Sequence, residues 1–394
     1  MSRTIFIIMS AIAACLSASA SDSIGWRHYL GLDVRPSYAF SSYHDDILKS
    51  MVDAANAKKT TLATSLHLKY GFTFSPFTPC GHYFPATWQG LGASVNFLGN
   101  SKGIGTPISI YAFQGAPIFR FSDKISLYYE WNFGASFGWK RCDGYTAYSN
   151  LVVGSSVNAY INLGTGLRWD ISDDYALTAG IDLTHFSNGN TSFPNPGVNL
   201  AGIKVGVTKS FRHIHKHSDY SQNFRNDTTK FKRSWGFDVT AYGAWRKRVY
   251  RGGEEPILLN GHFGVIGINV APMWNISNIF RIGPSIDVQW DESTDLKRHY
   301  ASGNTADDIL FYRPRVFDQV CLGISGRAEL VMPIFSVNVG IGYNVFGPEE
   351  TRATYELANL KVRISKHFFL NIGYQLLNFQ KQNNLMLGFG YKFR

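Results

Sequence analysis

The sequence lacks any long apolar run after its first twenty residues, which excludes a membrane-spanning helix from the mature chain. The N-terminal stretch MSRTIFIIMSAIAACLSASA combines an arginine, a short apolar run and small residues. This pattern predicts a secretory signal peptide over residues 1–20, cleaved after Ala20. The run Ile12–Cys15 leaves a lipoprotein cleavage box open as an alternative. An exported chain without a spanning helix is either soluble or a β-barrel.

Cysteine and charge are also scarce. Of four cysteines, Cys80, Cys142 and Cys321 remain after cleavage, and an odd, scattered set does not describe a disulfide framework. Charged residues make up only 17% of the chain, whereas aromatics reach 15% and glycines number 38, which favours the barrel. The net charge of +10 suits a phosphate-rich partner such as lipopolysaccharide, or serves solubility alone. No nucleic-acid partner is expected.

Alternation with a period of two residues fills most of the mature chain. In residues 124–139 one face is entirely apolar: Ile125, Leu127, Tyr129, Trp131, Phe133, Ala135, Phe137 and Trp139. Such a face, with aromatics at its ends, is typical of a lipid-facing strand. The last strand ends with Phe393 next to last, as in outer-membrane barrels. The predicted fold is therefore all-β, a transmembrane antiparallel β-barrel in the outer membrane of a Gram-negative bacterium.

The alternation predicts about sixteen strands. They are expected near 26–38, 60–75, 89–98, 106–121, 124–139, 152–170, 174–188, 197–210, 234–247, 258–274, 277–291, 315–332, 335–346, 355–365, 367–377 and 384–394. Residues 21–212 hold eight of them, residues 234–394 hold the other eight, and the basic segment 213–233 joins the halves. That segment is either a linker between two eight-stranded barrels or a turn within one large barrel. We expect one barrel, because only the final strand carries the terminal signature.

The stretch 175–187 raises a question of its own, because its apolar face ends in His185 and Ser187. In the following strand the apolar face likewise continues into Asn199. At roughly 3.3 Å per residue and a tilt of about 40°, the ten residues from Tyr175 to His185 climb on the order of 25 Å, the height of the apolar band. The three polar side chains are therefore expected together on the outer wall, where polar groups suggest function. The alternative is that all three simply lie among lipid headgroups.

These residue types suit a serine esterase. Ser187 would be the nucleophile, and His185, two residues away on the same face, would be its base. Asn199 can accept the other imidazole N–H and so orient the ring. Backbone N–H groups near Asn188 and Gly189, or the Asn188 amide, would hold the oxyanion.

The motif also resembles a known family. The run His185-Phe186-Ser187-Asn188, followed by Pro194-Asn195 and Gly197, resembles the outer-membrane lipid A 3-O-deacylases over about residues 26–212. The resemblance implies His185 as base, Ser187 as nucleophile and removal of the 3-linked acyl chain of lipid A. Members of that family place a glutamate fourteen residues after the histidine, where this chain has Asn199.

The same run, with an asparagine fourteen residues on, also resembles the outer-membrane phospholipases A. These are twelve-stranded, calcium-activated dimers, so calcium is the expected cofactor under that alternative and none is expected for a deacylase. His213, His215 and His217 are better explained as a solvated turn than as a metal site. Residues 234–394 match no enzyme motif.

Three hypotheses follow: a lipid A deacylase first, then a phospholipase A, then a non-catalytic porin or structural barrel. Glu130 and Asp182 face the lumen, where Arg168 and Lys204 are expected to pair with them in salt bridges. Because they face away from Ser187 through the wall, neither can replace the missing glutamate.

Overall fold

The computed structural model describes residues 26–40, 62–74, 81, 83–99, 101, 104–141, 153–193, 197–211, 231–250, 257–259, 261–294, 300–302, 310–311, 314–379 and 381–393. The predicted signal peptide, the three histidines after Phe211 and the Pro194-Asn195 pair lie outside the described residues. Within these ranges no helix has the length and apolar character that crossing a membrane requires.

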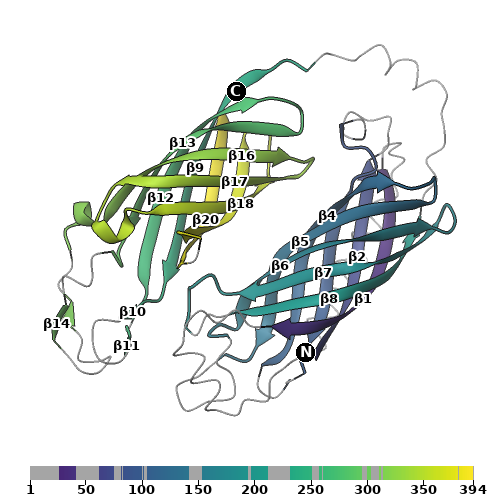
Figure 1. Ribbon diagram of the computed structural model, residues 1–394, viewed down its shortest axis with the longest axis horizontal. Helices are drawn as coiled ribbons and strands as arrows, with labels where there is room; N and C mark the ends of the chain where they lie inside the picture. Colours follow the sequence, from purple (N-terminus) through teal and green to yellow (C-terminus); the bar gives the residue numbers. More distant parts are fainter. Residues whose placement is uncertain are drawn as a thin grey trace.

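Two closed antiparallel barrels make up the structure (Figure 1). The first contains β1 Trp26–Phe40, β2 Leu62–Phe74, β3 Trp88–Phe97, β4 Gly105–Arg120, β5 Ile125–Trp139, β6 Val157–Asp170, β7 Tyr175–Ser187 and β8 Val198–Ser210. Each strand pairs with the next in sequence, and β8 pairs with β1 to close the ring. The sequence forms these strands because its period-two alternation gives each one an apolar and a polar face.

The second barrel is built in the same way. It contains β9 Ser234–Arg246, β12 Phe263–Asn275, β13 Phe280–Asp291, β16 Val320–Val331, β17 Phe335–Phe346, β18 Thr354–Arg363, β19 Phe368–Leu377 and β20 Lys381–Phe393, with β20 closing on β9. Two short ribbons lie in its connections, β10 Val249–Tyr250 with β11 Ile257–Leu258 and β14 Tyr300–Ser302 with β15 Leu310–Phe311. The connections also hold two short 3-10 helices, η2 Val316–Gln319 and η3 Glu349–Thr351.

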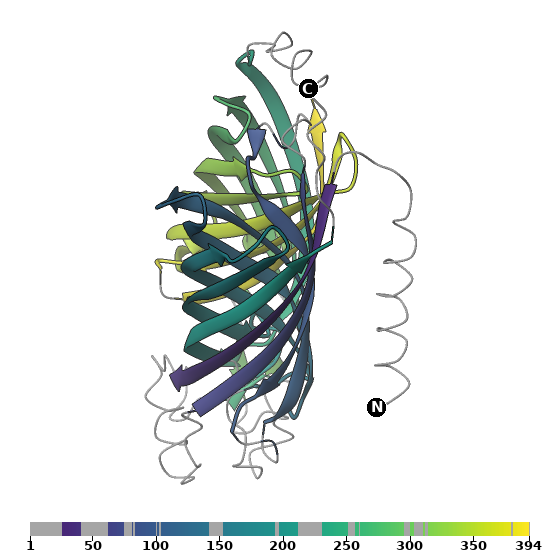
Figure 2. The ribbon, with the colours of Figure 1, turned by 90° about the vertical axis from the view of Figure 1, so that its right-hand side faces the viewer.

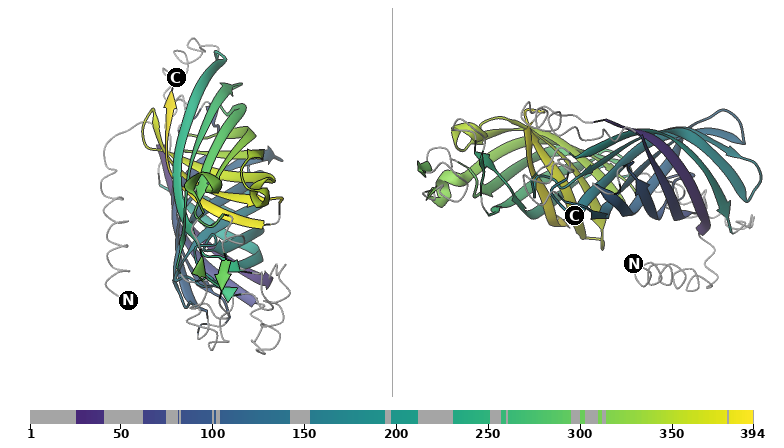
Figure 3. Two further views of the ribbon diagram at one scale, coloured as in Figure 1. Left: turned by 90° about the vertical axis from the view of Figure 1, so that its left-hand side faces the viewer. Right: turned by 90° about the horizontal axis from the view of Figure 1, so that it is seen from below.

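The all-β fold is confirmed, but the expectation of one sixteen-stranded barrel is wrong. Both rings close after eight strands, so neither half leaves an unpaired edge for the other. The terminal signature on the final strand could not reveal this, because it says nothing about which strand that end pairs with. The two barrels stand side by side in Figure 1 and in the right-hand view of Figure 3, whereas in Figure 2 one lies behind the other.

Side chains fill the interior of the first barrel, as expected for eight strands. Its inward residues include a buried charge network in which Arg35 contacts Asp33 at 2.9 Å and Asp182 at 2.8 Å. Lys204 lies 2.7 Å from Glu130, so the predicted lumen pairing of these two residues is confirmed.

The predicted role of Arg168 is corrected. Its Nε donates to Asp170 Oδ1 at 2.9 Å, nearer the Tyr175 end of the wall, rather than to Glu130 or Asp182. Asp182 is neutralised instead by Arg35, a residue 147 positions earlier in the chain. Closure of β8 on β1 brings these two side chains together, which local alternation does not show.

The outward face of β7 is apolar and open, as the alternation predicts. Leu177, Ile181 and Leu183 are 40%, 63% and 57% exposed, whereas the inward Asp182 is 4% exposed. The candidate site lies on this outward apolar wall at the C-terminal end of β7.

Candidate functional site

His185 and Asn199 form the centre of the candidate site. They lie opposite each other in the antiparallel β7–β8 pair, both on the outward face. The His185 Nδ1 atom lies 2.7 Å from the Asn199 side-chain oxygen. An amide oxygen only accepts, so Nδ1 carries the proton and donates it to Asn199. In the neutral tautomer with this hydrogen bond, the other ring nitrogen, Nε2, carries no proton and can accept one.

Ser187 lies next to this pair. It is the last residue of β7, two positions after His185 and on the same face, and all three side chains are half-buried. A Cβ built on Gly197 would lie 3.3 Å from His185 Cε1 and 3.5 Å from Ser187 Cβ. Both side chains therefore flank Gly197. Among the described residues no hydrogen bond joins the Ser187 hydroxyl to His185, and catalytic hydrogen bonds often tighten only once substrate binds.

Gly197 is a site residue to which the sequence analysis assigned no role. Its φ of +74° is one that L side chains rarely adopt, and a Cβ there would approach the Phe186 carbonyl oxygen to 2.5 Å. The residue was visible in the motif, but only the structure shows why it must be glycine.

A tight turn follows Ser187. The Thr191 N–H donates to the Asn188 carbonyl at 3.3 Å, and the two central residues, Gly189 and Asn190, have φ values of +61° and +68°. Two positive φ values in succession are typical of a type I′ turn, which favours glycine and asparagine. Gly189 and Asn190 tolerate these φ values, so the chain can reverse direction immediately after Ser187.

The Asn188 side chain holds this turn from the inside. It is 6% exposed, and its Nδ2 donates to the Ser192 carbonyl at 2.9 Å. The Asn188 amide therefore points away from the outward face on which Ser187 lies. The backbone N–H groups of Asn188 and Gly189 donate to no other described residue. Of the two predicted oxyanion donors, the geometry favours these backbone groups over the side-chain amide.

An apolar groove of about 840 Å³ lies on the outer wall beside the site. Its lining includes Leu183 and Ala201, each two residues from His185 and Asn199 on the same face, together with Leu163, Ile203 and Tyr38. A groove lined mainly by apolar side chains suits a hydrocarbon chain better than a sugar or a phosphate.

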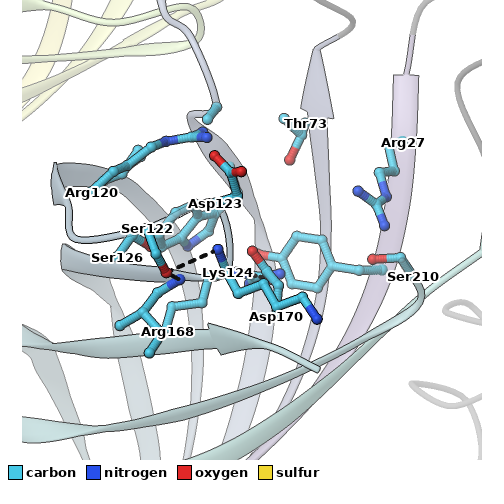
Figure 4. A pocket seen from close by; sticks show the side chains of 15 residues that line it. Arg27, Thr73, Arg120, Ser122, Asp123, Lys124, Ser126, Arg168, Asp170 and Ser210 are labelled. Carbon is cyan, nitrogen blue, oxygen red and sulfur yellow. Dashed lines mark hydrogen bonds and ion pairs between the residues drawn. The ribbon is translucent and has the colours of Figure 1, made fainter. Parts of the chain in front are cut away.

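A second pocket, of about 170 Å³, lies at the opposite end of the first barrel (Figure 4). It is polar: Arg27, Lys124, Arg168 and Asp170 surround its opening in Figure 4. The fifteen residues that line it include serines but no histidine to act as their base. This pocket therefore lacks the serine–histidine combination that lies at the Ser187 end of the barrel.

The described residues contain no group of three or more His, Cys, Asp or Glu side chains placed to hold a metal ion. Cys321 is a buried free thiol, and the other two mature cysteines lie outside the described ranges.

Several solved structures are similar to one half of this chain. Neisserial surface protein A is 12% identical and covers 47% of this chain and 97% of its own length, with a TM-score of 0.31. The outer-membrane enzyme PagL is 14% identical, covering 45% of this chain and 97% of its own, also with a TM-score of 0.31. The attachment invasion locus protein Ail of Yersinia pestis is 12% identical over 48% of this chain and 99% of its own, with a TM-score of 0.25. No curated protein sequence matches this chain.

Two family models match the chain, one in each barrel. Residues 64–208, which include His185, Ser187 and Asn199, match the family described as lipid A 3-O-deacylase. Residues 235–394 match the family described as the acyloxyacyl hydrolase C-terminal domain. The second half, in which the sequence showed no enzyme motif, is therefore also assigned to a family. Together the two matches cover most of the chain. The first barrel therefore belongs to the lipid A 3-O-deacylase family, the second barrel is an acyloxyacyl hydrolase C-terminal domain, and the protein lies in the Gram-negative outer membrane.

Proposed function

We propose that this protein is a serine esterase that removes the 3-O-linked acyl chain of lipid A. The observation that carries the proposal is the 2.7 Å contact between His185 Nδ1 and Asn199, with Ser187 next on the same outward face. The match of this region to the deacylase family supplies the substrate class.

In the first step His185 Nε2 takes the proton of the Ser187 hydroxyl as Oγ attacks the ester carbonyl of lipid A. The negative charge that forms on the carbonyl oxygen is stabilised by the backbone N–H groups of Asn188 and Gly189. Collapse of the tetrahedral intermediate breaks the bond to the sugar oxygen, which leaves as an alcohol after taking the proton from His185. Water, with His185 again as base, then hydrolyses the acyl-serine and releases the fatty acid.

Asn199 acts by positioning. It keeps the Nδ1 proton in place and so leaves Nε2 free to act as the base. An amide cannot stabilise the imidazolium as a carboxylate would, so we expect a slower enzyme than one with a glutamate at this position.

The surroundings of the site suit a lipid substrate. If the outward apolar walls face lipid, the stretch from Tyr175 to His185 crosses the apolar band and places Ser187 at the outer-leaflet boundary. The groove that includes Leu183 and Ala201 then receives the acyl chain. Export requires the predicted signal peptide, residues 1–20, and the net charge of +10 favours the phosphates of lipopolysaccharide.

Mass spectrometry of lipid A from Gram-negative cells that express the protein tests this proposal. We expect wild type to remove one 3-hydroxyacyl chain, Ser187→Ala to remove none, and Asn199→Ala to be slower by about 100-fold or more, because the imidazole loses its orienting partner. Heat-modifiable migration on gels checks that each variant is folded. Intact lipid A in cells with folded wild-type protein would contradict the proposal.

A phospholipase A is the second candidate, favoured by the Ser-His-Asn residue set itself. Under this alternative the wild-type protein releases fatty acids from glycerophospholipids, and chelation of calcium abolishes the release. Lipid A from the same cells would then remain fully acylated.

A further inference from the structure

The turn that follows Ser187 is the place where the candidate site touches the second barrel. Gly189 is buried, and a Cβ built on it would lie 2.5 Å from the Leu385 side chain of β20. The Lys247 N–H, just after β9, donates to the Asn190 carbonyl at 3.0 Å. The Asn190 side chain in turn donates to the Asn383 carbonyl of β20 at 3.4 Å. Both central residues of the turn thus rest on the second barrel.

This contact belongs to a longer interface. The Trp131 ring on the outward face of β5 packs edge-on against Phe335 of β17, with centroids 5.6 Å apart. Gln114 lies on the outward side of β4, where its side chain donates a hydrogen bond to the Tyr129 hydroxyl of β5. It is only 1% exposed. By contrast, Ile181 on the outward face of β7 is 63% exposed. The second barrel therefore covers the β4–β5 side of the first and leaves the outward face of β7 open. Figure 1 and the right-hand view of Figure 3 show the two barrels beside each other.

The part of the second barrel that receives Asn190 is held by buried hydrogen bonds. Arg246, 2% exposed, donates to the Asn383 carbonyl at 3.0 Å and also to the Asn383 side-chain oxygen. Its Nε donates to Ser293 at 3.0 Å, and it pairs with Asp291. Asn383 donates onward to Gln375 at 3.2 Å. The acceptor of the Asn190 hydrogen bond is thus fixed to three strands of the second barrel, β9, β13 and β19.

We infer that the second barrel positions the turn after Ser187, with Leu385 as the principal positioning residue. This inference rests on the proposed function. Oxyanion donors must lie about 2.7–3.1 Å from the developing charge, and a displacement of about 1 Å costs on the order of 100-fold in rate. Among the described residues, the turn's own hydrogen bonds join Asn188 to Thr191 and Ser192 and do not involve Gly189. The surface of Leu385 against Gly189 therefore adds the support that keeps the Asn188 and Gly189 N–H groups in place.

The test compares Leu385→Ala with Leu387→Ala in the full-length protein. Leu387 faces outward on the same strand and is 37% exposed, so the two variants remove the same atoms from neighbouring positions. Hydrogen exchange of the peptide over residues 186–193 reports on the turn, and hydrolysis of lipid A in mixed micelles reports on catalysis. We expect Leu385→Ala to speed exchange and to lower kcat, each by about tenfold, with KM within about twofold. Leu387→Ala should behave as wild type in both measurements.

A third variant separates the hydrogen bond from the apolar contact. Asn190→Gly keeps the positive φ that the turn requires and removes only the amide that donates to Asn383. We expect a smaller rise in exchange than with Leu385→Ala, because a single long hydrogen bond contributes less than the packing of Gly189 on Leu385.

Equal exchange in the two leucine variants would overturn the inference, whatever the activity. Faster exchange with unchanged kcat would show that the second barrel holds the turn but that catalysis does not need it, which also overturns the positioning role. If wild type shows no hydrolysis dependent on Ser187, the proposed function fails, and the exchange comparison still decides whether the second barrel holds the turn.

Discussion

Gly197 has no side chain, and this leaves the space in which His185 and Ser187 lie next to each other. Its positive φ is a requirement of the backbone. The space that a Cβ would occupy, 2.5 Å from the Phe186 carbonyl oxygen and 3.3 Å from His185 Cε1, is a separate requirement of the site. They can be told apart because Gly261 has a similar φ, +85°, and a Cβ built there would have nothing within 4 Å.

We predict that Gly197→Ala lowers esterase activity by about 10-fold or more, because its methyl group would lie 2.5 Å from the Phe186 carbonyl oxygen and 3.3 Å from His185 Cε1 and would force the site to shift. Gly261→Ala should carry a similar backbone strain, about 1 kcal/mol, and leave the activity unchanged. Assays of lipid A hydrolysis on both folded variants check this. Equal losses of activity would mean that backbone strain, and not crowding of the site, explains the effect.

At the scale of elements, the strands of the first barrel are held together from the inside by charge. Arg35 of β1 contacts Asp33 of its own strand and Asp182 of β7, and all three side chains are almost fully buried. β8 lies between β7 and β1 in the barrel, so this network links the two strands on either side of β8. Removing one member of a buried network leaves its partners charged and uncompensated.

We therefore predict that Arg35→Met lowers the free energy of unfolding by about 3–5 kcal/mol, measured by urea unfolding in detergent micelles or lipid. Arg168→Met is the matched control, because its pair with Asp170 is partly exposed and such a pair contributes no more than about 1 kcal/mol. A loss at Arg35 no greater than at Arg168 would show that the lumen network is not a source of stability.

At the scale of the whole molecule, the protein forms two eight-stranded barrels filled by side chains and not the single wide barrel expected from the sequence. A single ring of sixteen strands would leave an aqueous channel, whereas eight strands leave room only for side chains. Tyr111 and Phe113 in the first barrel and Tyr355 in the second are at most 1% exposed.

The protein is therefore expected to show no stable ion conductance in planar bilayers, in wild type and in Ser187→Ala alike. A bilayer recording with a known porin as the positive control tests this. Discrete, ohmic conductance steps would restore the porin hypothesis and contradict the filled lumens.

The sequence by itself determined which residues face outward and which face inward, because the period of a β-strand is a local property that alternation shows directly. It also brought His185, Ser187 and Asn199 onto one face, because the apolar pattern of the two strands fixes which residues face outward and thereby restricts their register. The 2.7 Å contact of His185 with Asn199 is the geometry that this register predicts.

Only the tertiary structure decided where the rings close, since closure depends on β1 meeting β8 and β9 meeting β20 across long stretches of chain. It also decided that Asp182 pairs with Arg35 and that Gly189 rests on Leu385. These contacts join residues more than 140 positions apart, and no local pattern of residues encodes them. The inward and outward faces of a strand follow from its own residues, whereas its long-range contacts depend on the packing of the whole barrel.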